Sequence, residues 1–266
     1  LSLPSSPGAK LTLNDVARGC GVSRATVSLV LRGSPLVHPD TRAKVEAEIR
    51  RIGYIYNRAA ANLRSRSSSS VALVINDLSN PFFAEFATGV DEALAGAGCV
   101  TLLGSTGEST QRQQAVLSSL IEHAPAGIIL SPAEGSDGSA IAKAVGRHVP
   151  VLVFNRELDG EWDFLAMENQ RGARLATEHL IALGHTHVAF FGGHRDSSSC
   201  RERHAGYLEA LIAAGIEVEA RWRIDTAPTR LEAAHLAGAL FEGDLSPTAA
   251  VCYNDAVALG LQLGLL

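Results

Sequence analysis

Apolar residues recur at helical spacing in three short segments between residues 10 and 56. A spacing of three and four residues places such side chains on one face of a helix. The third segment follows Pro39, which suits the first turn of a helix, and stops at Gly53, which favours a helix end. The pattern therefore predicts three short helices. The apolar positions are Val27, Val30 and Leu31 in the second segment and Val45, Ile49 and Ile52 in the third.

Polar residues mark where the first two helices begin. Thr12 and Asp15 form a T-x-x-D capping box ahead of LNDVARGC, in which the two residues bond the free amides of the first turn. Ser23 is a favourable N-cap for RATVSLVL, and Gly21 permits a tight turn between the two helices. Three short helices with a glycine turn between the first two predict a helix-turn-helix domain.

From Val71 onward, short apolar runs alternate with amphipathic segments. The runs VALVIN, CVTLLG, GIILS, PVLVFN, VAFFGG and TAAVCY are typical of buried strands, and the segments between them of helices. This alternation predicts an α/β fold with parallel sheets and helices on both faces. We divide the chain into a disordered tail (1–9), a helix-turn-helix domain (10–56), a short helical hinge with a serine linker (57–70) and an α/β domain (71–266).

Charge is divided unequally between the two parts of the chain. Residues 1–70 carry 11 Lys and Arg against 4 Asp and Glu, a net charge of +7. Residues 71–266 carry 12 against 24, a net charge of −12, which gives the net charge of −5 for the whole chain. A basic segment ahead of an acidic one indicates that the first part meets a polyanion, although a solvated charged surface would have the same composition.

The second helix of a helix-turn-helix enters the major groove of DNA, and the residues at its N-terminal end face the base edges. Those residues are Arg24, which has the donors to bond guanine twice, and Ala25, which offers a methyl surface to thymine. The alternative is a helical hairpin with an incidental arginine. The candidates for phosphate contact are Ser23, Thr26, Ser28 and Arg32.

The stretch LTLNDVARGCGVSRATVSLVLRGSPLVHPDTRAKVEAEIRRIGYIYNRAAANLRS resembles the LacI/GalR family of bacterial repressors almost position by position. The resemblance implies a hinge helix from Asn57 to Leu63, with Ala60 and Leu63 meeting the minor groove. We assign Thr12 and Leu29 to the same DNA interface, although several relatives carry a polar or basic residue in place of Leu29. His38 stands where a serine often caps the third helix, which predicts a weaker cap.

The resemblance continues through DLSNPFFAEFATGVDEAL, LGHTHVAFFGG, CRERHAGYLEAL and PTAAVCYNDAVALG. It implies a two-lobed sensor, similar to periplasmic sugar-binding proteins, whose further strands would follow residue 266. Phe82 and Phe83 would enclose an effector in the cleft or, alternatively, only pack their helix. Asp255 would accept hydrogen bonds, or only cap the last helix together with Asn254. The expected donors are Asn155, Arg156 and Arg201, with Arg203 assigned to a structural ion pair.

Enzyme and membrane signatures are not found in the sequence. No glycine-rich stretch ends in Lys-Ser or Lys-Thr, and no G-x-S-x-G motif occurs. Ser197 to Ser199 fit a polar loop. His185, His187 and His194 resemble metal ligands, but His185 and His187 lie around a loop-to-strand junction without neighbouring carboxylates, so we expect no catalytic site, metal or cofactor. The four separated cysteines fit reduced packing residues. No run approaches the ~18 apolar residues of a membrane span, and no secretion signal is present, so we expect a cytoplasmic protein.

Together these observations predict a homodimeric, or tetrameric, transcription regulator of the repressor type. Its partners would be double-stranded operator DNA and a small effector, a sugar or sugar derivative, bound between two α/β lobes. A solute-binding protein would have no use for residues 1–70, and a sugar-modifying enzyme would need catalytic residues.

Overall fold

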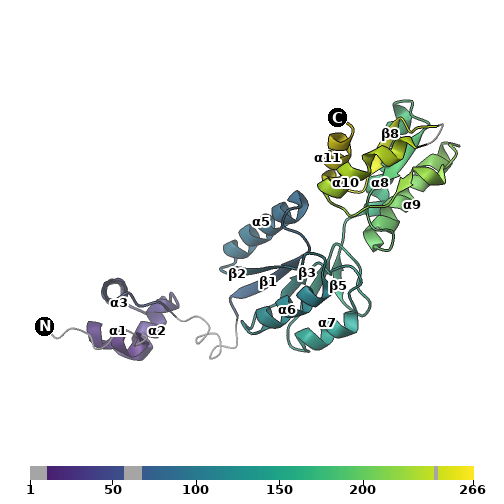
Figure 1. The fold of residues 1–266 in the computed structure, drawn as a ribbon. Coiled ribbons are helices and arrows are strands. Elements are labelled where there is room, and N and C mark those ends of the chain that lie inside the picture. The colour runs from purple at the N-terminus through teal and green to yellow at the C-terminus, as the bar shows by residue number, and fades with distance from the viewer. Residues whose placement is uncertain (1–10, 57–67, 243–244) are drawn as a thin grey trace. The chain divides into compact units, whose positions relative to one another are not determined.

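The computed structural model describes residues 11–56, 68–242 and 245–266. The tail expected at residues 1–9 and the hinge residues Asn57, Ala60 and Leu63 lie outside this part of the chain. The chain separates into two compact units, Leu1–Arg66 and Ser67–Leu266, which we call unit 1 and unit 2 (Figure 1).

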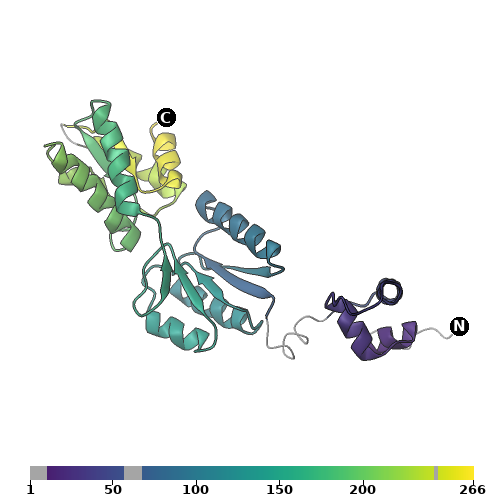
Figure 2. The ribbon, with the colours of Figure 1, turned by 180° about the vertical axis from the view of Figure 1, so that it is seen from behind.

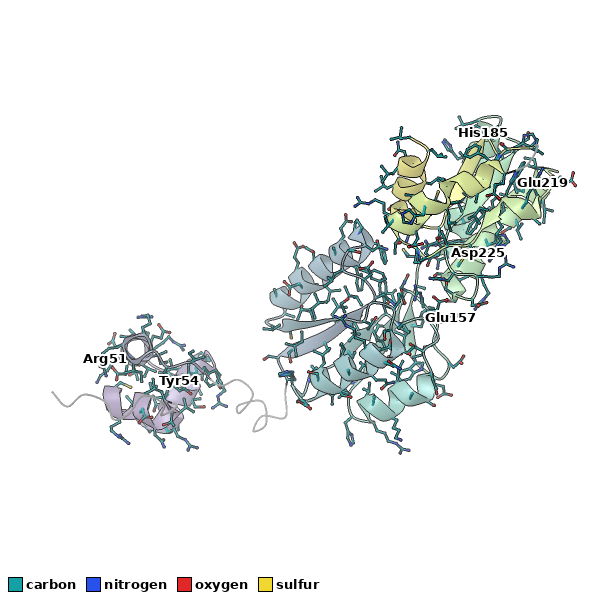
Figure 3. The ribbon with its side chains drawn as sticks, in the orientation of Figure 1. Arg51, Tyr54, Glu157, His185, Glu219 and Asp225 are labelled. Atoms are coloured by element: carbon teal, nitrogen blue, oxygen red, sulfur yellow. The ribbon has the colours of Figure 1, made fainter. Side chains whose placement is uncertain are left out.

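The described part of unit 1, residues 11–56, contains the three expected helices, α1 (Leu13–Cys20), α2 (Arg24–Leu31) and α3 (Pro39–Ile52). Gly21 and Gly53 follow α1 and α3 at φ values of 65° and 68°, a left-handed conformation that glycine adopts without a steric penalty. Tyr54 turns back toward the helices and is buried with them (Figure 3). The apolar core of unit 1 consists of Val16, Ala17, Cys20, Val27, Val30, Val45 and Tyr54.

The predicted caps are present at all three helix starts. The Asp15 carboxylate accepts hydrogen bonds from the Thr12 hydroxyl at 2.7 Å and the Thr12 amide at 2.9 Å, and these two bonds lower the pKa of Asp15. The Ser23 hydroxyl accepts a bond from the amide of Thr26 at 3.1 Å. His38 does cap α3, because its Nδ1 accepts from the amide of Asp40, but the 3.4 Å distance fits a weaker cap than serine.

Unit 2 begins with lobe 1, a five-stranded parallel sheet in the order β2-β1-β3-β4-β5. Figure 1 shows α5 on one face of this sheet and α6 and α7 on the other. The strands are β1 (Ser70–Ile75), β2 (Val100–Ser105), β3 (Ile128–Leu130), β4 (Val151–Phe154) and β5 (Asp163–Leu165), and the helices are α5 (Pro81–Gly96), α6 (Thr110–Ile121) and α7 (Gly138–Val145).

Alternation along β1 explains why helices cover both faces. Ala72 and Val74 pack with Leu117 of α6, whereas Leu73 and Ile75 pack with Phe83 of α5. Successive side chains of a strand point to opposite faces, so a run of buried apolar residues needs a helix on each side. The carboxyl ends of the parallel strands are left at one edge, where ligands bind in such folds.

Lobe 2 has a three-stranded parallel sheet in the order β7-β6-β8. Helices α8 and α9 lie side by side in both views (Figures 1 and 2). None of the helices in the described ranges is long and apolar enough to cross a bilayer. The elements are α8 (Asn169–Ala182), β6 (Val188–Phe191), α9 (Ser198–Ala213), η1 (Ala220–Trp222), β7 (Arg223–Ile224), α10 (Arg230–Leu236), η2 (Ala237–Phe241), β8 (Ala249–Cys252) and α11 (Asp255–Gly264).

His204 of α9 is held in its neutral form in lobe 2. Burial first, and then the charge of Arg223, lower its pKa to about 4. Its Nδ1 lies 3.2 Å from Nη1 of Arg223, so the neutral imidazole accepts this bond, with its own proton on Nε2. The ring also packs edge-on against Phe190 at 5.1 Å.

This lowered pKa predicts an acid-sensitive lobe. The folded value lies below the ordinary value of 6.5, so the unfolded chain binds more protons between pH 6.5 and 4. The stability that His204 contributes is complete above pH 6.5 and is lost as the pH falls toward 4. Thermal unfolding should therefore show a steeper loss of Tm over this range in the native chain than in His204→Gln. If Tm fell equally with pH in the native chain and in His204→Gln, His204 would not be the group that causes the acid sensitivity.

Candidate functional site

The first turn of α2 carries the residues expected to read bases. Arg24 and Ala25 follow the Ser23 cap and are exposed, whereas Val27 and Val30 on the other face are buried. The helix thus packs one face into unit 1 and leaves its N-terminal end open to solvent. This is the arrangement in which an arginine fork can reach a guanine edge in the major groove.

The other candidates for DNA contact surround this turn or lie at the start of α1. Thr26 directs its hydroxyl toward that of Ser23 at 2.9 Å. Ser28 and Leu29 are half-buried, and the exposed Arg32 donates from Nε to the carbonyl of Ser28 at 3.2 Å. Thr12 is exposed but holds the α1 capping box.

Unit 2 contains a cavity of about 1010 Å³ between its lobes, which we call cavity A. Its walls come from the segments after β1, β2 and β4 in lobe 1, and from α8, α9 and the start of α11 in lobe 2. The lining residues used below are Phe82, Phe83, Glu108, Asn155, Arg156, Glu168, Asn169, His194, Arg203, Tyr253 and Asp255.

The two phenylalanines line cavity A and also pack against lobe 1. Phe83 is 5% exposed and belongs to the core beneath α5, yet it also lines cavity A. Phe82 is half-buried, meets Phe83 edge-on at 5.2 Å and stacks on Phe154 at 5.9 Å. The aromatic wall is therefore fixed by the packing of lobe 1.

Two polar candidates are placed by the local backbone. The Asn254 side chain caps α11 by accepting from the amide of Val257 at 2.8 Å, so the capping role does not need Asp255. Asp255 is exposed at the first position of α11 and lines cavity A. Asn155 has a φ of 71°, uncommon for a residue with a side chain, and its amide donates to the carbonyl of Leu165 at 2.9 Å.

Glu108 is a residue that sequence reasoning missed. Its carboxylate accepts two parallel bonds from Arg156, at 2.7 Å and 2.9 Å, and a third from Asn76 at 3.0 Å. The Arg156 side chain is only 8% exposed. Burial acts to lower the pKa of Arg156, but the hydrogen bonds and charge of Glu108 outweigh it and raise that pKa. Asn76, Glu108 and Arg156 each follow a strand, and such a strand-end carboxylate is the signal that would have identified Glu108.

Four buried polar atoms at this sheet edge have no hydrogen-bond partner among the described residues. Each belongs to a residue directly after a strand or close to its end. Such atoms are costly to bury unpaired, which indicates that ordered water or a ligand completes the network. They are Asn76 Oδ1, Thr106 Oγ1, Ser131 Oγ and Arg156 Nε.

The expected roles of Arg201 and Arg203 are not the ones that their positions favour. Arg203 lines cavity A, donates from Nε to the Asn169 side chain at 2.8 Å and lies over the ring of Tyr253 at 4.8 Å. Neither of these two partners is a carboxylate, so they do not form the expected ion pair. Arg201 lies outside the lining of cavity A. Residues two apart on a helix point in different directions, and the sequence alone did not tell which of them faces inward.

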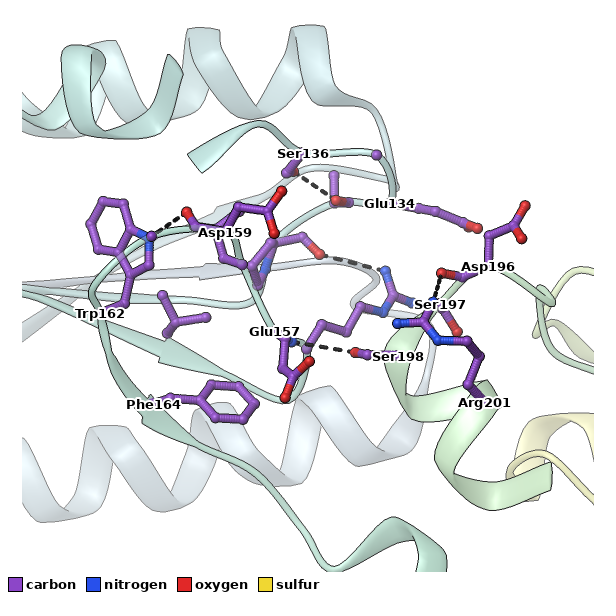
Figure 4. Close-up of a pocket in the computed structure, with 17 residues that line it drawn as sticks. Glu134, Ser136, Glu157, Asp159, Trp162, Phe164, Asp196, Ser197, Ser198 and Arg201 are labelled. Atoms are coloured by element: carbon purple, nitrogen blue, oxygen red, sulfur yellow. Dashed lines mark hydrogen bonds between the residues drawn. The ribbon is translucent and has the colours of Figure 1, made fainter. Parts of the chain in front are cut away.

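A smaller cavity of about 490 Å³, cavity B, lies beside cavity A and also joins the two lobes. Figure 4 shows Trp162 and Phe164 of lobe 1 on one side, Arg201 of lobe 2 on the other and Glu157 between them. The Glu157 amide donates to the Ser198 hydroxyl at 3.3 Å, which links the lobes. Arg156 lines both cavities.

The histidines considered as metal ligands have other contacts. His185 Nδ1 lies 2.9 Å from the Thr248 hydroxyl, and His187 packs edge-on against Trp222 at 5.3 Å. His194 faces Glu134 at 3.7 Å. In the part of the chain that the structure describes, no group of three or more His, Cys, Asp or Glu residues is arranged to hold a metal ion.

Two family models match the chain. Residues 12–57 match the model described as bacterial regulatory proteins, lacI family. Residues 68–266 match that of periplasmic binding proteins and the sugar-binding domain of the LacI family.

Similar proteins cover nearly the whole chain. The maltose regulon regulatory protein MalI of Escherichia coli is 34% identical over 97% of this chain and 75% of its own length. The transcriptional regulator GalR of the same organism is 30% identical over 94% and 73%. The lac repressor dimer bound to operator and an anti-inducer superposes with a TM-score of 0.82 and 25% identity, over 97% and 78%. A CelR–cellobiose complex gives a TM-score of 0.63 and 28% identity, over 96% and 77%.

Proposed function

The chain belongs to the LacI family of DNA-binding bacterial regulatory proteins, and from that premise we propose that it represses transcription through α2 under the control of a sugar in cavity A. One observation carries this proposal. The same chain contains a helix-turn-helix with an exposed N-terminal end of α2 and a cavity between two lobes with aromatic and polar walls. We place this activity in the cytoplasm, where bacterial operator DNA is found.

In the proposed DNA complex, the first turn of α2 lies in the major groove. Arg24 bonds a guanine and Ala25 meets a thymine methyl group, while Ser23, Thr26, Ser28 and Arg32 approach phosphates. Leu29 and Thr12 lie at the border of this interface. Two chains bind as a dimer, and the hinge residues Asn57, Ala60 and Leu63 enter the minor groove, as the family resemblance implies.

The base-reading role predicts the behaviour of two variants at Arg24. Arg24→Ala should weaken binding to the selected operator by about 1 to 3 kcal/mol, with little effect on random DNA, because the lost contact is to a base. Arg24→Lys keeps the charge but loses the planar fork, so it should lose most of the same selectivity. Both are measured by mobility shift on operator and random duplexes at one salt concentration. Equal losses on both duplexes would make Arg24 a phosphate contact.

The chemistry of cavity A favours a neutral polyhydroxylated ligand. Phe82 and Phe83 provide an apolar wall for the C–H face of a sugar ring, and Asn155, Arg203 and Asp255 provide donors and acceptors for hydroxyl groups. Arg156 is already paired with Glu108, so it offers little free positive charge to an anionic ligand. One relative named for the maltose regulon and one structure with cellobiose support this class.

Ligand binding would regulate DNA binding by linkage. A ligand that contacts both lobes binds one relative arrangement of the lobes better than others and shifts the population toward it. In a dimer, unit 2 of each chain is joined to one copy of unit 1, so the arrangement of the lobes changes how well the two copies of unit 1 fit the operator together.

The placement of the two arginines predicts different effects at cavity A. A panel of neutral mono- and disaccharides is first screened by thermal shift, and the sugar found is then titrated calorimetrically. Arg203→Ala should weaken its binding by about 10-fold or more, because hydrogen bonds to a charged group contribute about 1.5 to 3 kcal/mol. Arg201→Ala removes the same charge outside cavity A and should change the affinity by less than about threefold. The reverse order would restore Arg201 as the ligand residue.

A further inference from the structure

We propose that cavity B is a second binding site, for one neutral sugar ring or a similar small polyol, distinct from the effector site in cavity A. The proposal does not depend on what cavity A binds. At about 490 Å³, cavity B is large enough for a small organic molecule. Both lobes contribute to its wall, so an occupant would bridge them.

Its aromatic side chains are placed to meet a ring. Phe164 belongs to β5, an edge strand whose three residues are all exposed, and its own exposed fraction is 44%. Trp162 is half-buried, and its indole N–H donates to the carbonyl of Asp159 at 3.0 Å. The indole nitrogen therefore has its partner within the protein, and the ring is held in place as an apolar surface. Sugar C–H faces pack on such surfaces.

Its polar groups suit hydroxyls. Glu134 and Glu157 of lobe 1 and Asp196 of lobe 2 offer carboxylate acceptors, and Arg201 offers a planar set of donors. Arg156 adds a second, independent observation, because its Nε is buried without a hydrogen-bond partner among the described residues. Carboxylates and an arginine that face an aromatic wall match the vicinal hydroxyls of a sugar.

The balance of charge selects against anions. Four carboxylates line cavity B, those of Glu134, Glu157, Asp159 and Asp196. Of the two arginines in the lining, Arg156 is already neutralised by Glu108 at 2.7 Å, which leaves Arg201. A phosphorylated or carboxylated sugar would face excess negative charge, so a neutral ring fits the cavity better.

Two contacts lie at the border between cavity B and cavity A and connect the residues of the two cavities. Glu134 of cavity B faces His194 of cavity A at 3.7 Å, from one lobe to the other. Arg156 lines both cavities and is held by Glu108, which lines cavity A. A molecule in cavity B would thus contact Arg156 and Glu134, which line cavity A or touch its lining, and the two affinities would be coupled reciprocally.

Trp162 makes the proposal directly testable. The second tryptophan, Trp222, is 2% exposed in the core of lobe 2, so a ligand in cavity B should change the emission of Trp162 alone. The chain is titrated with D-glucose, D-galactose, D-ribose and maltose, each up to about 10 mM, a range that covers weak sugar sites. We expect a saturable change in emission with at least one of these sugars.

Variants distinguish cavity B from cavity A. The change should persist in Asp255→Ala, which alters cavity A only, and be absent in Trp162→Phe. Arg201 is exposed, so Arg201→Ala should leave the fold intact, and it should weaken the affinity of cavity B for the sugar by about 10-fold or more. No saturable change with any of the four sugars, or its loss in Asp255→Ala, would overturn the proposal and leave the assignment of cavity A standing.

Discussion

Glu108→Ala is expected to lower the free energy of unfolding of unit 2 by about 3 kcal/mol, because it leaves a buried guanidinium without its counter-charge. The side chain of Arg156 is 8% exposed and that of Glu108 29%, so water reaches the pair from one side and the loss falls at the low end of the usual range. The same carboxylate also accepts from the Asn76 side chain and the Glu134 amide. Urea unfolding should show a lower midpoint with an unchanged m-value.

A surface arginine–glutamate pair with a single hydrogen bond provides the control. Arg171 and Glu168 are bonded at 2.9 Å, but their side chains are 65% and 75% exposed. Glu168→Ala should therefore change stability by less than about 1 kcal/mol. The double variant Glu108→Ala with Arg156→Met should recover part of the loss, because no unpaired charge is then buried. Equal losses for the buried and the surface pair would show that the burial of Arg156 has no energetic consequence.

Local signals were enough to predict the helices of unit 1 and the longer strands of unit 2. Thr12, Gly21, Ser23 and Gly53 each act through bonds or backbone angles within a few residues, so the sequence states their role directly. The two-residue strand β7 and the three-residue strand β5 were not predicted. Such short segments have no periodicity of their own and become strands only because a neighbouring strand pairs with them.

The site was less predictable, because it depends on contacts between distant parts of the chain. The family resemblance identified Phe82, Asn155 and Asp255 as candidates, and all three line cavity A. Glu108 and Arg156 are 48 residues apart and meet only because β2 and β4 end at the same sheet edge. The side of α9 that faces cavity A could not be predicted either, because it depends on how α9 packs on α8.

The close packing of α9 on α8 predicts a large loss of stability in the variant Gly206→Ala of α9. A Cβ atom at Gly206 would lie 2.0 Å from the carbonyl oxygen of Gln170 and 2.9 Å from the amide nitrogen of Arg174, both in the backbone of α8. Backbone atoms within a helix cannot move aside individually, so the two helices must separate. We expect a loss of about 3 kcal/mol, at the upper end of the usual overpacking range, and a fall in Tm of about 6 to 12 °C for a unit of this size.

Gly89→Ala in α5 provides the control with the opposite sign. Nothing lies within 4 Å of a Cβ atom at Gly89, and alanine favours a helix over glycine by about 1 kcal/mol, so this variant should be slightly more stable. Gly206→Ala should also weaken sugar binding in cavity A, because separating the helices lengthens the 2.8 Å bond between Arg203 of α9 and Asn169 of α8. Calorimetric unfolding and titration of both variants measure the two effects. If Gly206→Ala were as stable as the native chain and bound sugar equally well, the close approach of α8 and α9 would not be what orients Arg203 into cavity A.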